Sequence, residues 1–226
     1  MPREPLARRL TAEAIGVTVL VAAVVGSGIM AERLADGNAA LALLCNAIAT
    51  GAILVVLVTI FGPLSGAHFN PAVSLVFALR RELPRRDLAP YVAAQCAGGI
   101  AGTLVAHLMF GLAPLVIGTH GRSGGGQWLG EIVATFALVL TILGGIRHAP
   151  AALPWLVGLV ITAGYWFTSS TSFANPAVAL ARGFTQSFAG IALGDVPAFV
   201  LAELVGALIA VALAQLLFPD KGAQAT

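Results

Sequence analysis

Apolar residues gather in six long runs along the chain, separated by short polar stretches. The runs cover about 10–31, 38–60, 88–110, 128–146, 151–168 and 195–218. Each run is long enough to cross a bilayer, because a membrane-spanning helix needs ~20 apolar residues. Two shorter apolar segments, 70–80 and 175–184, have about half that length. The pattern predicts an all-α membrane protein with six transmembrane helices and two re-entrant half-helices.

Both short segments open with the tripeptide Asn-Pro-Ala. The six residues are Asn70, Pro71, Ala72, Asn175, Pro176 and Ala177. The tripeptide predicts a helix start, because Asn is a strong N-cap and Pro is well tolerated at the first helical position. Lipid offers no partner for the free N–H groups of such a start. Two half-helices that enter from opposite faces and meet at mid-membrane satisfy this need if their ends line a wet cavity.

The two halves of the chain repeat one another. AEAIGVTVLV in the first half parallels GEIVATFALV in the second, and each contains an intramembrane acid, Glu13 or Glu131. Repeat one covers about 10–110 and repeat two about 128–218. Each repeat has three spans, so the second is predicted to be inverted relative to the first, with the functional centre near the midplane. We expect one domain over residues 1–226.

Composition narrows the function classes. The chain has 226 residues, of which 58% are hydrophobic and 10% charged, against about 25% charged in a typical soluble domain. The four histidines are scattered and both cysteines lie in apolar runs, so no metal site and no disulfide framework are indicated. No pairing of nucleophile and base is present. We therefore expect no enzyme activity, no cofactor and no nucleic-acid partner.

The basic residues are distributed unevenly between the predicted loops. With the N-terminus inside, the cytoplasmic side holds Arg3, Arg8, Arg9, Arg80, Arg81, Arg85, Arg86, Arg147 and Lys221, and the outside holds Arg33, Arg122 and Arg182. Nine against three fits the positive-inside rule. The prediction is a multi-pass protein of the cell (inner) membrane with both termini cytoplasmic.

The motifs carry a resemblance to a known family. SGAHFNPAV at 65–73 and NPAV at 175–178, on an inverted six-helix frame with Glu13 and Glu131 in matching helices, resemble the aquaporin or major intrinsic protein family. Two such motifs on half-helices are highly specific, and the resemblance covers nearly the whole chain. The stretch AGYWFTSSTSFANPAV further resembles bacterial aquaporins of the arsenic-resistance type. The resemblance implies a passive channel, assembled as a homotetramer with one pore per subunit.

The two asparagines are the predicted centre of the pore. Each half-helix start carries roughly half a positive charge from the helix dipole, which repels cations. The side-chain amides of Asn70 and Asn175 can donate to the oxygen of a passing solute. The family implies that Glu13 and Glu131 support the half-helix loops, and a proton-relay role is the alternative. Glu203 is expected to be a further loop support.

The predicted selectivity filter departs from the usual family pattern. Most members have arginine directly after the second Asn-Pro-Ala, whereas this chain has Val178. The other filter positions map to Thr50, Ser172 and Ala163, with Gly164 or Tyr165 as alternatives to Ala163. Arginine supplies a fixed charge and up to five donors, and valine supplies neither. The filter is therefore expected to be wider and less polar than that of a water-specific channel.

Two basic residues close to the motifs leave alternatives open. Arg182 lies four residues after Val178, so it falls on the same helix face. It is predicted either to sit in the external vestibule, or to extend to the membrane interface or pair with a loop. His68 either contacts solute in the cytoplasmic vestibule or braces the loop.

The sequence thus predicts passive diffusion of small neutral solutes and water across the bilayer. Metalloid hydroxides such as arsenite and methylated arsenicals are the expected substrates, with some permeability to water and glycerol. One alternative is a general water or glycerol channel. Another is an ion-coupled secondary transporter, which also uses inverted repeats and broken helices. A third is a non-conducting junction protein, blocked by Tyr165, Trp166 and Phe167.

Overall fold

Helices make up all regular secondary structure in residues 4–218, the part of the chain that the computed structural model describes. They are α1 (Leu6–Leu34), α2 (Ala39–Ser65), α3 (Pro71–Leu79), α4 (Arg85–Met109), α5 (Gly125–His148), α6 (Leu153–Phe167), α7 (Pro176–Arg182) and α8 (Val196–Leu217), with 3-10 turns at Pro150–Ala152 and Leu193–Asp195. Six helical segments are long and apolar enough to cross a membrane. The predicted architecture of six spans and two half-helices is confirmed.

The apolar runs determine where each helix lies in the sequence, and capping residues determine where it begins and ends. α1, α2, α4 and α5 extend a few residues beyond the predicted runs at one end or both, because polar residues such as Arg8 and Ser65 continue the helices into the interfaces. The side chain of Asn38 caps α2 by accepting from the backbone N–H of Leu41 at 3.1 Å. α6 begins with Pro154 in its first turn, where a missing N–H costs nothing.

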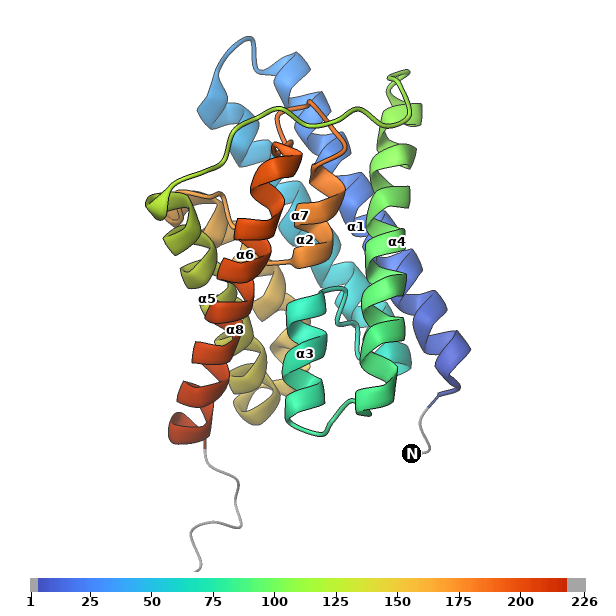
Figure 1. The fold of residues 1–226 in the computed structure, drawn as a ribbon, viewed down its shortest axis with the longest axis vertical. Coiled ribbons are helices and arrows are strands. Elements are labelled where there is room, and N and C mark those ends of the chain that lie inside the picture. Colours follow the sequence, from blue (N-terminus) through green and yellow to red (C-terminus); the bar gives the residue numbers. More distant parts are fainter. Residues whose placement is uncertain (1–3, 219–226) are drawn as a thin grey trace, which may run out of the picture.

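The two repeats form two similar three-helix groups. α1 packs against α2 and α4, and α5 packs against α6 and α8, while α2 meets α6 between the groups. The half-helices α3 and α7 lie end to end in the middle of the bundle (Figure 1). The loop between α4 and α5 crosses the face where α1 ends (Figure 1). We call this the loop face, and we call the opposite one, where α1 begins and α8 ends, the terminal face.

Glycines allow the paired helices to approach closely. A Cβ on Gly98 of α4 would overlap the carbonyl of Ala14 in α1, and Thr18 donates its hydroxyl to the Gly98 carbonyl at 3.0 Å. In the second repeat a Cβ on Gly206 of α8 would overlap the carbonyl of Ile132 in α5. Small residues at such crossings are the usual contact device between helices in lipid. Both repeats therefore use the same packing.

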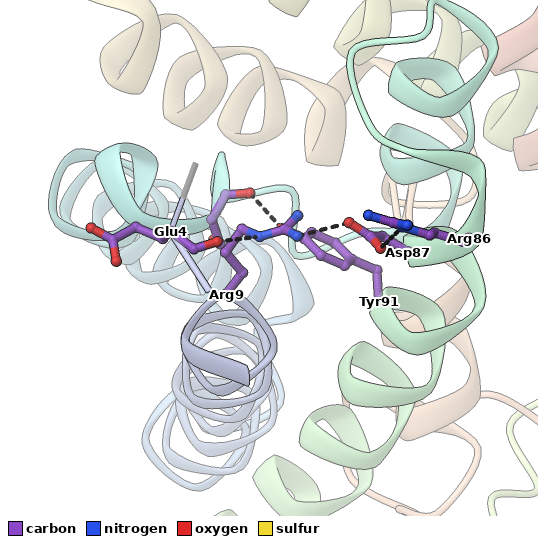
Figure 2. Close-up of polar contacts among 6 residues, drawn as sticks. Glu4, Arg9, Arg86, Asp87 and Tyr91 are labelled. Carbon is purple, nitrogen blue, oxygen red and sulfur yellow. Dashed lines mark hydrogen bonds and ion pairs between the residues drawn. The ribbon is translucent and has the colours of Figure 1, made fainter. Parts of the chain in front are cut away.

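Arg9 anchors the start of α1 at the terminal face (Figure 2). Its guanidinium bonds to the Asp87 carboxylate at 2.7 Å, to the Tyr91 hydroxyl at 3.3 Å and to the Glu4 carbonyl at 3.1 Å. Tyr91 in turn donates to the carbonyl of Ser65 at the end of α2 at 3.0 Å. These bonds tie α1, α2 and α4 together at the terminal face.

The basic residues divide between the two faces as the sequence predicts. Arg8, Arg9, Arg80, Arg81, Arg85, Arg86 and Arg147 lie at helix ends of the terminal face, and Arg33, Arg122 and Arg182 lie toward the loop face (Figure 1). The predicted cytoplasmic residues Arg3 and Lys221 lie outside the described residues.

Candidate functional site

Both half-helices begin at the predicted asparagines. The Asn70 side-chain oxygen accepts from the backbone N–H groups of Ala72 at 2.8 Å and Val73 at 3.4 Å. Asn175 makes the equivalent pair of bonds at 3.0 and 3.3 Å. A proline follows each asparagine at the first helical position. Each asparagine oxygen is therefore occupied as an N-cap.

The two asparagines also tie the half-helix tips to each other. The Asn70 amide nitrogen donates to the Ala174 carbonyl at 2.6 Å, and the Asn175 amide nitrogen donates to the Phe69 carbonyl at 2.8 Å. A side-chain amide has two N–H donors. One donor of each asparagine therefore links the loops, a role that the sequence analysis did not anticipate, and one remains for a solute.

The two loops before the asparagines share an uncommon backbone. Phe69 and Ala174, one residue before each asparagine, have φ of 51° and 49°. Ala67 and Ser172, three residues before, have φ of 47° and 52°. Non-glycine residues rarely adopt this left-handed conformation, which costs of order 1–3 kcal/mol each. The surrounding structure must therefore hold both loops in place.

Glu13 of α1 holds the first loop. Its carboxylate accepts the backbone N–H groups of His68 at 3.0 Å and Phe69 at 2.6 Å, and the Ser65 hydroxyl at 2.6 Å. The Glu13 side chain is fully buried. A buried carboxylate needs several donors, and the loop supplies them.

Glu131 of α5 holds the second loop in the same way. Its carboxylate accepts the backbone N–H groups of Phe173 at 2.9 Å and Ala174 at 2.7 Å. Both acids thus bind the residues one and two places before each asparagine. This is the contact that the predicted supporting role requires.

A second polar residue assists each acid, and here the repeats differ. Gln95 of α4 donates its amide to Glu13 at 2.8 Å and to the Ser74 hydroxyl at 2.9 Å. Glu203 of α8 instead accepts the backbone N–H of Asn175 at 2.9 Å. The predicted loop contact of Glu203 is therefore present. Glu203 binds the loop backbone directly, whereas Gln95 binds the side chains of Glu13 and Ser74.

A cavity of about 240 Å³ runs past both half-helix tips. Its walls include both asparagines. Toward the terminal face it is lined by Leu54, Val58, His68, Phe77, Ile142, Ile146, Leu153 and Val157, and toward the loop face by Thr50, Tyr165, Ser172, Val178 and Arg182. Apart from His68, its terminal-face end is apolar, and most of its polar groups lie at the loop face.

On α6 the cavity is lined by Tyr165, one of the predicted alternatives, and not by Ala163, so the expectation that Ala163 faces the pore is wrong. The Tyr165 hydroxyl lies 3.1 Å from the Thr50 hydroxyl across the cavity, whereas Ala163 is exposed on the outer surface of the helix. Gly164 is buried and packs against Ser172. The ring of Tyr165 therefore fills part of the space that the small side chain of Thr50 leaves open.

Two neighbouring aromatic residues do not block the cavity. Trp166 and Phe167 are 49% and 57% exposed on the outside of the bundle. The helical turn that points Tyr165 inward points these two residues outward. The sequence-based alternative of a plug formed by all three aromatics is therefore wrong for two of them.

Arg182 does not extend to the membrane interface. Its side chain is 2% exposed and lines the cavity, and its Nε donates to the carbonyl of Ala189 in the following loop. Its guanidinium carbon lies 3.3 Å from the centroid of the Phe173 ring. Of the predicted alternatives, loop pairing and a position beside the cavity are both observed, and they occur together.

His68 lines the cavity and also packs within the first loop. Its ring stacks on Phe77, with centroids 4.6 Å apart, and its Nδ1 lies 3.1 Å from the Ser74 hydroxyl. The two predicted roles, solute contact and bracing, are thus compatible.

Sequence reasoning missed Arg122 as a residue of this region. Its guanidinium carbon lies 5.0 Å from the Phe173 centroid, although the two residues are distant in sequence. Arg122 stands in a glycine-rich stretch without periodicity, so no pattern in the chain indicated where its side chain lies.

Comparison with known proteins identifies the family. The family model described as Major intrinsic protein matches residues 2–151. The chain belongs to the major intrinsic protein family. The protein named Aquaglyceroporin AqpS of Rhizobium meliloti (strain 1021) is 68% identical over 92% of this chain and 89% of its own length. The protein named Probable aquaporin AqpM of Archaeoglobus fulgidus is 32% identical over 91% of this chain and 94% of its own.

A solved structure shows the same fold. The aquaglyceroporin from Plasmodium falciparum superposes with a TM-score of 0.74 at 20% identity, covering 95% of this chain and 98% of that one. As a member of the major intrinsic protein family, this chain is a multi-pass membrane channel for small solutes, not an enzyme. The cavity between the half-helices is the candidate path of those solutes.

Proposed function

We propose that this channel conducts small uncharged solutes, with metalloid hydroxides such as arsenite and methylated arsenicals as substrates and with some permeability to water and glycerol. The observation that carries the proposal is the wall of the cavity beside the second half-helix. Val178 stands there without charge or donor, next to Thr50, Tyr165 and Ser172. A solute with a few hydroxyl groups and an apolar remainder matches such a wall. A relative that is 68% identical is named an aquaglyceroporin.

The tips of the half-helices suit passage of neutral molecules. Two helix N-termini point at the same place, and their dipoles disfavour cations there. The remaining N–H of Asn70 and of Asn175 can donate to a solute oxygen in turn. On this path the solute passes both Asn-Pro-Ala motifs, the filter residues and His68, and these residues contact it in turn.

The buried acids favour a channel over an ion-coupled transporter. A coupled transporter needs an ion site near the midplane. Glu13 and Glu131 each accept two loop N–H groups, and neither lines the cavity. Both carboxylates therefore hold the loops, and neither is placed to bind a permeating ion.

The proposal includes an orientation and an assembly. The terminal face is cytoplasmic and the membrane is the cell (inner) membrane, because seven of the ten basic residues in the described part of the chain lie at that face. The single channel domain works as a homotetramer. Exposed large side chains such as Leu159, Leu201 and Leu208 on the outer helix surfaces are available for contact with lipid or with other copies.

Stopped-flow measurements on proteoliposomes test the proposed substrate range. Water, glycerol, urea and arsenite are compared for the native chain and for Val178→Arg. The arginine adds charge and bulk to the cavity wall, so glycerol and arsenite flux should fall about tenfold or more, which corresponds to roughly 1.4 kcal/mol in the barrier. Water flux should fall much less.

Val178→Ala is the matched control, since it changes side-chain size without adding charge. Its glycerol and arsenite fluxes should equal or exceed those of the native chain. Equal arsenite flux in the native chain and in Val178→Arg would show that Val178 does not determine which solutes pass. A native chain that passes water and glycerol but no arsenite would leave the general water or glycerol channel as the function.

A further inference from the structure

Arg182 brings an unshared positive charge to the cavity. Its Nη1 is buried and has no hydrogen-bond partner among the described residues, while its Nε is held by the Ala189 carbonyl. The guanidinium stacks on the ring of Phe173, an arrangement in which arginine is favoured. Because arginine keeps its proton in proteins, a fixed cation with a free donor borders the cavity one turn beyond Val178.

Arg122 brings a second charge to the same ring from the loop between α4 and α5. Its Nε donates to the Gly190 carbonyl at 2.9 Å and its Nη1 to the Ser170 carbonyl at 3.3 Å. Its backbone N–H donates to the Asp195 carboxylate at 2.7 Å. The side chain is nearly buried. These bonds fix Arg122 beside Phe173, so two guanidinium groups share one aromatic ring.

Among the described residues, no acid lines the cavity beside this pair of arginines. Glu131 and Glu203 are the buried acids that attract Arg182, but both accept loop N–H groups and both are absent from the cavity wall. Charges act strongly over short distances where water is scarce. A cation entering from the loop face therefore meets Arg182 at the cavity wall, with the charge of Arg122 beside the same Phe173 ring, before it reaches the half-helix tips.

The first repeat shows that this charge is particular to one end of the cavity. His68 and Phe77 stack at the terminal-face end, and they occupy the positions in repeat one that Phe173 and Arg182 occupy in repeat two. The stacked pair is kept in both repeats, while the guanidinium is found in one only. Packing alone does not require an arginine at this place.

We propose that Arg182 and Arg122, stacked on Phe173, form a displaced cation barrier at the loop-face end of the cavity. The barrier stands in for the filter arginine that Val178 replaces. Because it lies one turn away from Val178, it excludes cations and protons without narrowing the cavity at the filter. The free Nη1 of Arg182 also donates to the oxygen of an uncharged solute. This inference rests on the proposed function and deepens it.

Proteoliposomes containing the full chain test the barrier. Proton entry is read by a trapped pH dye under an imposed membrane potential, and glycerol entry by light scattering. Arg182→Met keeps a long side chain without charge, so the ratio of proton to glycerol flux should rise roughly tenfold or more. Arg182→Lys keeps the charge and should hold that ratio near the native value. Arg122→Met should raise it by a smaller factor.

Arg33→Met is the matched control. Arg33 also lies over an aromatic ring at the loop face, 5.1 Å from the centroid of Phe110, but it is exposed and does not line the cavity. Its substitution should leave both fluxes unchanged. The double variant Val178→Arg with Arg182→Met, which moves the charge one turn inward, should bring the proton flux back down.

An unchanged flux ratio in Arg182→Met would overturn the barrier, as would a native chain that leaks protons as fast as that variant. If Arg182→Met does not reconstitute, Arg122→Met decides the question, because its ratio must then rise. A native chain that excludes protons but passes no glycerol or arsenite would refute the proposed function instead. The two failures are therefore distinguishable.

Discussion

The two half-helix loops are built on one plan and differ in the chemistry that they present. In each loop the residue before the asparagine has a left-handed backbone, with φ of 51° at Phe69 and 49° at Ala174. In each, a buried glutamate accepts the two N–H groups before the asparagine, and the asparagine amide bonds to the other loop. The scaffold of the cavity is therefore duplicated almost atom for atom.

The side chains around that scaffold are not duplicated. Gln95 donates its amide to Glu13 in the first repeat, whereas Glu203 in the second accepts the backbone N–H of Asn175 and carries no amide with which to donate to Glu131. The stacked pair is His68 with Phe77 at one end and Phe173 with Arg182 at the other. The duplicated atoms therefore hold the loops, and the unduplicated side chains give the two ends of the cavity different properties.

Removal of a loop-holding acid should have the largest effect. Glu131→Ala leaves the buried N–H groups of Phe173 and Ala174 without acceptors, at about 1–3 kcal/mol each. The left-handed backbone beside them then loses its support. We expect the apparent melting temperature in detergent to fall by more than 10 °C and glycerol flux in proteoliposomes to be nearly lost. Glu13→Ala should behave alike if the two loops are equivalent.

Glu32→Ala is the control for that experiment. Glu32 also accepts a backbone N–H, that of Phe188 at 3.0 Å, but it lies exposed at the loop face. An exposed N–H can bond to water, so this variant should retain its melting temperature within a few degrees. A mild effect of Glu131→Ala, similar to that of Glu32→Ala, would show that the loops hold their conformation without the buried acids.

Exchange of the assisting residues should have an intermediate and unequal effect. Gln95→Glu replaces an amide that donates to Glu13 and Ser74 with a group that has no permanent donor, beside a buried carboxylate. We expect a loss of about 1–3 kcal/mol in stability. Glu203→Gln keeps an acceptor for the Asn175 N–H and adds donors near Glu131, so it should cost less than ~1 kcal/mol.

Thermal unfolding in detergent, compared between the two single variants and the native chain, measures this inequality. Glycerol flux confirms that each variant still forms the pore. Equal losses of stability in both variants would mean that Gln95 and Glu203 support their loops equally. The two repeats would then differ here in sequence but not in function.

Most of the fold could be predicted from the chain alone, because the signals are strong and local. Apolar runs of helical length fix the six spans, and Asn-Pro-Ala marks both half-helix starts at the residues observed. The repeat pairs Glu13 with Glu131, which places both acids against the loops. The predicted division of basic residues between the faces also agrees with the structure for the described residues.

Other features depend on how distant segments meet, and no local pattern reports them. Ala163 was expected at the filter, but the rotation of α6 at its last turn points Tyr165 inward instead. The bonds from each asparagine amide to the other loop join residues more than a hundred positions apart. Arg122 reaches Phe173 from a loop of irregular sequence. Each of these is a tertiary contact between segments without a shared motif.

The smallest expected effect concerns the hydroxyl contact at the polar end of the cavity. Tyr165→Phe and Thr50→Val each remove one partner of the 3.1 Å contact between α2 and α6, so each should cost about 0.5–1.5 kcal/mol. Because the two changes break the same bond, the double variant should lose less stability than the sum of the losses in the two single variants. Thr59→Val, which removes an exposed hydroxyl that donates to the Val55 carbonyl in the apolar half of α2, is the control and should add independently to either variant. Strict additivity of Tyr165→Phe and Thr50→Val would mean that the two hydroxyls contact solute or water separately, and the loop-face end would then resemble the terminal-face end in having no bond across the cavity.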